Sequence, residues 1–151
     1  MVFSIAYHFL HDRALAEEAA QDVFLQLHRH LPELETPEHV LFWLRKAATR
    51  RAIDCWRRRK HEPRVSLEKV PEPAVPAAPG DIMLTEKLRR LVASLPEKLR
   101  MTVILRYQED LGPTEIARVT GVPVRTVKSR LIQANALLRE KLVRTLEEEE
   151  A

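Results

Sequence analysis

The chain has 151 residues, enough for one ordinary domain or two small ones. A hydrophobic content of 45% beside 31% charged residues argues against a disordered chain, and the lone Cys55 excludes a disulfide framework. Only three glycines and few aromatic residues favour helices, and no apolar run reaches the ~18 residues of a membrane span. We therefore expect a cytoplasmic, all-α protein without membrane insertion. Its net charge of +3 is mild, so the placement of the charges matters more than their sum.

The first half of the chain, residues 1–61, predicts three helices. The first covers about Val2 to Leu10. Asp12 is suited to cap a second helix that runs to about His30, because a short carboxylate accepts hydrogen bonds from free first-turn amides. Thr36, followed by a proline, is suited to cap a third helix that runs to about Arg59.

The middle of the chain, "EPRVSLEKVPEPAVPAAPGD" at residues 62–81, has no helical period and is rich in proline and alanine. Proline removes amide donors and biases the preceding residue toward extended geometry, so this stretch predicts a semi-stiff linker. The alternative is a loop packed on one domain.

The second half, residues 82–146, predicts four helices. One covers about Ile82 to Ser94, and Pro96 begins the next, with Tyr107 on its inward face. A short helix starts at Gly112-Pro113 and ends at Gly121, and a last helix runs from Pro123 or Val124 to about Thr145. Residues 147–151 form an acidic tail. The fold class is thus two small helical domains joined by a linker.

Residues 113–132 have the spacing of a helix-turn-helix motif. Ala117 is the small residue that a close helix crossing needs, Gly121 supplies positive φ in the turn, and Val127 is the apolar plug from the second helix. The stripe that continues from Val127 leaves one polar face outward, with Lys128 at its margin. That face comprises Arg125, Thr126, Ser129, Arg130 and Gln133. Arginine, serine and threonine bind base edges or phosphates, so this face predicts DNA binding; the alternative is a helical hairpin with a solvated basic face.

The third helix ends in a second basic segment, "WLRKAATRRAIDCWRRRK" at residues 43–60, with eight basic residues against the single acidic Asp54. A solvated helix usually mixes signs to gain i,i+4 pairs, whereas a phosphate backbone would neutralise this excess. Trp43 fits the core or its edge better than a base-stacking platform, and Trp56 has no assignable face. Two nucleic-acid surfaces on one tether would bind two separated pieces of one duplex.

These features resemble the extracytoplasmic-function (group IV) sigma factors of bacterial RNA polymerase. "AEEAAQDVFLQLHRHL" is similar to their region 2.2, "FWLRKAATRRAIDCWRRRK" to regions 2.3 to 2.4, and residues 94–142 to region 4, most specifically at Pro-x-x-Thr-Val-Lys-Ser-Arg-Leu. The resemblance implies that residues 1–61 bind core polymerase and the −10 element, and that residues 82–146 bind the −35 element. It implies as partners the β′ clamp helices, the β flap, promoter DNA and an anti-sigma factor, with no cofactor and no catalysis.

The resemblance also assigns roles to single residues. The polymerase-binding helix carries Glu17, Glu18, Gln21 and Asp22. Phe24 lies on the same helix and fits the core better. The −10 element would be contacted by a base-holding loop and the basic helix after it, at Leu34, Glu35, Thr36, Trp43, Arg50, Arg51, Arg57 and Arg58. The −35 element would be read by Arg125, Thr126, Lys128, Ser129, Arg130 and Gln133.

The sequence departs from the family pattern at three places. The chain begins later than family members usually do, which predicts a truncated chain or a misassigned start and a first domain short of core. Arg50 stands where the family often has asparagine, which removes an acceptor and adds charge. The base-holding loop has no aromatic residue.

Two other function classes remain as alternatives. A helix-turn-helix regulator acting without polymerase would explain residues 113–139 but would leave the acidic residues 17–22 and the basic residues 43–60 without a role. A metalloenzyme is suggested only by six histidines, and no carboxylate or cysteine completes a ligand set with them at the usual spacing. No Gly-rich phosphate loop and no nucleophile–base arrangement is present.

Overall fold

A computed structural model describes residues 1–61 and 79–151, with side chains from residue 85 onward in the second range. Residues 62–78, most of the predicted linker, lie outside the described residues. The described part contains helices and no strand, which confirms the all-α fold class. In chain order the elements are α1 (Val2–Leu10), α2 (Arg13–His30), the short η1 (Leu31–Glu33), α3 (Pro37–His61), α4 (Pro79–Ala93), α5 (Glu97–Val103), the π-helical η2 (Ile104–Gln108), α6 (Pro113–Thr120) and α7 (Val124–Glu150). Among these, none has the length and apolar character needed to cross a membrane.

The helices of the first half begin where short polar side chains cap them. Asp12 Oδ1 accepts a hydrogen bond from the Leu15 amide at 3.0 Å, and Thr36 Oγ1 accepts one from the His39 amide at 3.1 Å. Each bond satisfies one of the free amides of a first helical turn. Both predicted caps are therefore confirmed.

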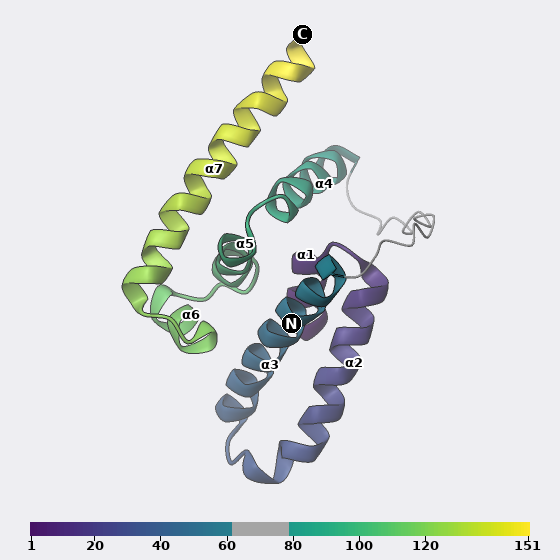
Figure 1. Cartoon of the computed structure of the whole chain (residues 1–151), viewed down its shortest axis with the longest axis vertical. Coiled ribbons are helices and arrows are strands. Elements are labelled where there is room, and N and C mark those ends of the chain that lie inside the picture. The colour runs from purple at the N-terminus through teal and green to yellow at the C-terminus, as the bar shows by residue number, and fades with distance from the viewer. Residues whose placement is uncertain (62–78) are drawn as a thin grey trace.

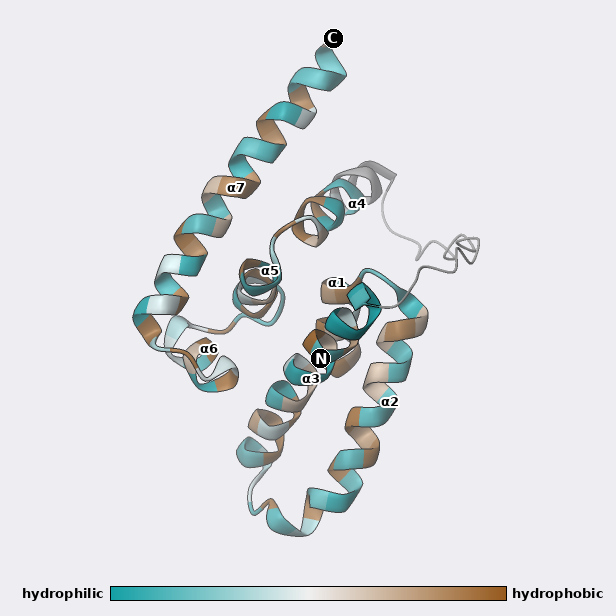
Figure 2. Cartoon of the chain, in the orientation of Figure 1, coloured by the Kyte–Doolittle hydropathy of each residue, from teal (hydrophilic) through white to brown (hydrophobic). Residues whose placement is uncertain are grey.

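The α2 and α3 helices run side by side, and α1 packs against both (Figure 1). The most apolar of the three is α1, which Figure 2 shows brown over most of its length. From α2, this core receives small side chains: Ala16, Ala19, Ala20 and Val23. Small residues let the helices approach closely, and Phe24 is left on the outer face, 51% exposed. The prediction that Phe24 belongs to the core is therefore wrong.

The second half departs from its predicted register within α5. This helix passes into η2, a π-helical turn, which has more residues per turn than an α-helix and so rotates the side chains that follow. Leu105 is fully buried, whereas Tyr107 is 59% exposed. The inward placement predicted for Tyr107 is wrong, because the π-helical turn shifts the side chains out of α-helical register.

The last helix, α7, extends beyond its predicted end near Thr145. It continues to Glu150, so most of the predicted acidic tail is helical, and its C-terminal turns extend past α5 and α6 (Figure 1). An ion pair between Lys87 of α4 and Glu149 ties the two helices together near that end.

One continuous core joins the two halves of the chain. Its buried members include Ile5 and Phe9 of α1, and Leu105, Ile116 and Val127 from beyond the linker. Around this core, α1 contacts α4 and η2, and α3 contacts α6. A smaller cluster, with Leu95 and Ala134 at its centre, holds α5 against α7. The predicted division into domains at residues 62–81 stays a prediction, and the structure adds an interface between the two parts.

Candidate DNA-binding and polymerase-binding surfaces

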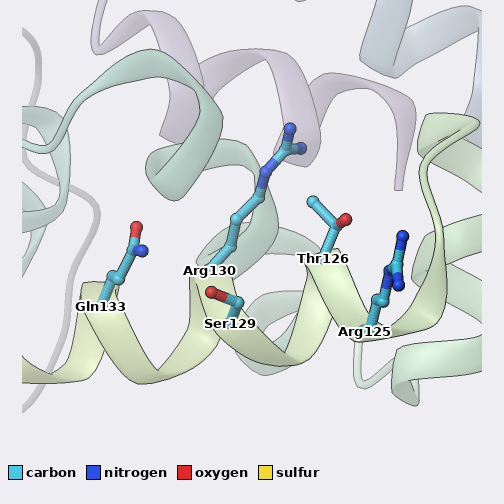
Figure 3. Close-up of a pocket in the computed structure, with 5 residues that line it drawn as sticks. All are labelled: Arg125, Thr126, Ser129, Arg130 and Gln133. Carbon is cyan, nitrogen blue, oxygen red and sulfur yellow. The ribbon is translucent and has the colours of Figure 1, made fainter.

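The predicted −35 face lies on the first three turns of α7. Figure 3 shows its side chains on one side of the helix, around a shallow open hollow. The residues that line this hollow are Arg125, Thr126, Ser129, Arg130 and Gln133. Lys128 is exposed but does not line the hollow, as expected of a residue at the margin. The structure thus brings together five of the six residues assigned to this element.

The turn between α6 and α7 aims this face outward. Gly121 ends α6 in the left-handed conformation, at φ 75°, and its amide donates to the Ala117 carbonyl at 2.8 Å. A side chain at that φ would be strained, so glycine fits the position. Val127 is fully buried, and Pro123 is the residue that precedes α7 at its N-terminus. The predicted motif geometry is confirmed at Gly121 and Val127.

The cations of this face have no carboxylate partner in the described part of the chain. Arg125, Lys128 and Arg130 take part in none of the ion pairs found there. The first turn of α7 also carries no acidic residue, so the positive end of its helix dipole adds to the field. An anionic ligand would meet an open cationic surface here.

The predicted −10 residues are more dispersed. Leu34 closes η1 and is half-buried, Glu35 is exposed, and Thr36 is exposed but already caps α3. Trp43 is half-buried, with its ring 5.5 Å from that of His30, which confirms its place at the edge of the core. Of these four residues, Glu35 and Thr36 are thus exposed, whereas Leu34 and Trp43 are half-buried.

The arginines of α3 differ from one another in their partners. Arg50 and Arg58 are exposed, and no ion pair in the described residues includes them. Arg51 has a side chain only 17% exposed and forms an ion pair with Asp22 of α2. Arg57 pairs with Glu97 of α5, from beyond the linker, at 2.6 Å. Adjacent arginines thus have different environments.

The predicted polymerase-binding residues separate in the same way. Glu17, Glu18 and Gln21 are exposed on the outer face of α2. Asp22 is half-buried and its carboxylate is held by Arg51, so these two predicted site residues are joined to each other. Sequence spacing does not reveal this pair, because the residues lie on different helices.

Sequence reasoning also missed Arg100, a buried cation at the centre of the molecule. It is 5% exposed, and burial lowers the pKa of its guanidinium while nearby Glu97 partly opposes the change. Its Nη1 donates to the Phe9 carbonyl at 2.9 Å, and its Nε and Nη2 donate to the Leu95 carbonyl. No periodicity marks this role, because its main partners are backbone carbonyls.

No group of three or more potential metal ligands occurs within the described ranges. Of the histidines, His11 lies 3.8 Å from Glu86, and His8 bonds to the Ser4 carbonyl at 2.7 Å. These two rings are thus engaged by a carboxylate and by a backbone carbonyl.

Comparison with known proteins matches both halves of the chain to one family. Residues 1–62 match the family described as Sigma-70 region 2, and residues 85–136 match Sigma-70, region 4. The chain belongs to the sigma-70 family.

Curated relatives specify the branch of this sigma-70 family. The ECF RNA polymerase sigma factor SigW of Bacillus subtilis is 25% identical over 158 residues, which cover 93% of this chain and 82% of SigW. The ECF RNA polymerase sigma factor SigE of Mycolicibacterium smegmatis is 30% identical over 152 residues, covering 95% of this chain and 58% of SigE. The ECF RNA polymerase sigma-E factor of Escherichia coli is 41% identical over 68 residues, covering 42% of this chain and 36% of that protein. This chain is therefore an ECF sigma factor, which directs promoter recognition together with RNA polymerase.

Proposed function

We propose that the two cationic helices of this sigma factor share promoter recognition, with α7 reading the −35 element and α3 with its preceding loop contacting the −10 element. The observation that carries the proposal is the hollow on α7, where two arginines, a threonine, a serine and a glutamine lie together on one side of the helix. Recognition helices of this motif contact bases near their N-terminus, which is where Arg125 lies.

Within this face we assign different tasks to the two arginines. Arg125 is exposed in the first turn of α7 and contacts a base edge. Arg130 is half-buried one turn further along and contacts phosphate. A base-edge contact changes discrimination at one position, whereas a phosphate contact changes affinity for every sequence alike.

In the first half, the exposed Glu17, Glu18 and Gln21 of α2 dock on the β′ clamp helices of core polymerase. The neighbouring Phe24 and Leu25 are 51% and 63% exposed and extend this surface with apolar area. A mixed acidic and apolar face suits a protein partner better than DNA. The second half docks on the β flap, and a cognate anti-sigma factor competes for these surfaces.

Transcription by reconstituted holoenzyme tests the proposal. Promoters selected from random duplex DNA are transcribed with the wild-type chain and with Arg125→Ala. The matched control is Arg139→Ala, an exposed arginine further along the same helix. Loss of discrimination at one −35 position with Arg125→Ala, and none with Arg139→Ala, is the expected result. Equal transcription from all three proteins would contradict the assignment of α7 as the reading helix.

The alternative of a regulator that acts without polymerase is tested separately. Glu17→Lys combined with Glu18→Lys reverses the charge of the outer α2 face, and is expected to abolish co-purification with core polymerase. Lys98→Glu, a charge reversal at an exposed residue of α5, is the control. Wild-type chain that fails to co-purify with core polymerase would favour the alternative.

A further inference from the structure

The segment that joins α2 to α3, residues 31–36, contains the loop assigned to the −10 element (Figure 1). Its residues are exposed except for Leu34, which is half-buried. A segment with so little buried area has little packing of its own to fix its conformation. The contacts at its two ends therefore decide how it is presented.

The contacts within this segment and at the start of α3 are local. The Leu34 amide donates to the Leu31 carbonyl at 3.1 Å inside η1, and Thr36 Oγ1 accepts from the His39 amide at 3.1 Å. Each bond joins residues that are close neighbours in the chain. Bonds of this kind shape a turn, but they do not fix its direction relative to the two long helices.

His30, the last residue of α2, makes a contact that crosses from one helix to the other. The centroid of its ring lies 5.5 Å from that of Trp43 in α3, with the two planes tilted by 41°. Trp43 is half-buried and packs against the core, so it is a fixed partner. Ring pairs at such separations attract each other beyond the area they bury. The residue before the segment is thus held to the helix that follows it.

The same imidazole also reaches the segment itself. His30 Nδ1 lies 3.3 Å from Glu33 Oε2, and the two side chains are 48% and 75% exposed. An ion pair so exposed to water contributes little energy. The ring contact with Trp43 is therefore expected to be the stronger of the two contacts, while the bond to Glu33 acts only within η1.

We propose that His30 is a positioning residue for −10 recognition, which holds residues 31–36 in their base-binding conformation through its contact with the Trp43 ring. The inference rests on the proposed function, in which this loop contacts the −10 element. His30 acts through the loop and Trp43. Recognition requires the contacting groups to be placed within about 0.5 Å, so a loosened end of the loop lowers discrimination between bases.

Discrimination is measured by transcription with reconstituted holoenzyme and the full-length chain. Promoters are varied to every base at each −10 position, and the ratio between the best and the worst base is taken at each position. This ratio does not depend on the fraction of chain that is folded and bound to polymerase, so a purely structural loss leaves it unchanged. His30→Ala is expected to lower the ratio at one −10 position by at least about fivefold, the lower end of what one base contact contributes. Unchanged ratios at all −10 positions would overturn the proposal.

Two further substitutions separate the contacts of His30. His30→Phe keeps an aromatic ring against Trp43 but cannot bond to Glu33, whereas His30→Gln keeps a polar group for Glu33 but has no ring. The phenylalanine variant is expected to retain most of the wild-type ratio, and the glutamine variant to lose as much as His30→Ala. The reverse order would overturn the assignment to the ring contact.

His28→Ala is the matched control. His28 is an exposed histidine in the same last turn of α2, and it takes no part in the contact between His30 and Trp43. Its replacement is expected to leave every ratio unchanged. A loss equal to that of His30→Ala would overturn the specific role of His30.

Hydrogen exchange in the free full-length chain tests positioning without DNA. With His30→Ala, the amides of residues 31–36 are expected to exchange about two- to tenfold faster than in wild type, the range that a ring pair contributes to an opening equilibrium. His30→Phe is expected to exchange as wild type does. Equal exchange in all three proteins would overturn the positioning role.

The two measurements distinguish failure of this inference from failure of the proposed function. Wild-type holoenzyme without base preference at any −10 position would contradict the proposed function, and the inference would fall with it. A wild-type preference that His30→Ala retains in full would overturn the role of His30 alone and leave the proposed function standing.

Discussion

The two cationic helices differ in what their arginines already contact. In α3, Arg51 is bound to Asp22 and Arg57 to Glu97, so part of the positive charge is neutralised inside the protein. In α7, Arg125 and Arg130 have no such partner in the described part of the chain. A count of basic residues therefore overstates the charge that α3 offers to DNA. The helix with fewer cations presents the more open cationic surface.

The greatest loss of stability is expected from a charge placed on the buried stripe of α7 rather than on its outward face. Val127→Asp places a carboxylate at a fully buried position without a partner, and should lower the free energy of unfolding by at least about 4 kcal/mol. Lys128→Asp, one residue further and exposed, should leave stability within about 0.5 kcal/mol of wild type. Urea denaturation followed by circular dichroism measures both. Similar stability of the two variants would mean that α7 is not packed through Val127.

The next effect concerns the open arginines of α7. Arg125→Ala should remove about 1–3 kcal/mol of discrimination at one −35 position while leaving thermal unfolding unchanged. Arg130→Ala should weaken all sequences alike and reduce the magnitude of the salt slope of duplex binding by about one unit. Binding titrations at several salt concentrations distinguish the two outcomes. Identical behaviour of the two variants would remove the division between base and phosphate contacts.

A smaller effect distinguishes neighbours on α3. Arg51→Ala breaks a partly shielded ion pair between α3 and α2, and should cost about 1 kcal/mol of stability. Arg50→Ala, next to it and exposed, should be nearly neutral for stability but should weaken −10 binding. A double-mutant cycle with Asp22→Ala isolates the pair. Additive effects of Arg51→Ala and Asp22→Ala would show that the pair carries no coupling.

The smallest effect is a pH dependence of stability that comes from α1, the helix on which α3 packs. Burial lowers the pKa of His8 in α1, and Arg89 and His11 act in the same direction, against the Ser4 carbonyl and Glu109. The unfolded chain then binds this proton more readily than the folded chain. Stability falls as pH drops below the ordinary histidine pKa of about 6.5, and levels off below the folded pKa. In thermal unfolding, His8→Gln should lose less stability than wild type as the pH falls. An equal loss of stability in both proteins would show that other groups cause it.

Much of the fold follows from short-range patterns. The caps at Asp12 and Thr36, the left-handed Gly121 and the plug at Val127 were predictable, because each depends on a few neighbouring residues and on backbone stereochemistry. The errors at Phe24 and Tyr107 have a common origin. Helical periodicity identifies an apolar stripe, but which side of it is covered depends on the neighbouring helices and, at Tyr107, on one π-helical turn.

The candidate sites likewise combine features that depend on local sequence with contacts between helices. Residue type and local spacing were enough to predict an all-α chain, a helix-turn-helix with its outward face, and the resemblance to the sigma-70 family. The packing of the helices was needed to show that Arg51 pairs with Asp22, that Arg57 pairs with Glu97, and that Arg100 donates to the Phe9 carbonyl at the end of α1. Each of these contacts joins residues on different helices, where sequence separation carries no information about distance. An arginine is charged wherever it stands, and the partner that the fold places opposite it decides whether that charge binds DNA or the protein itself.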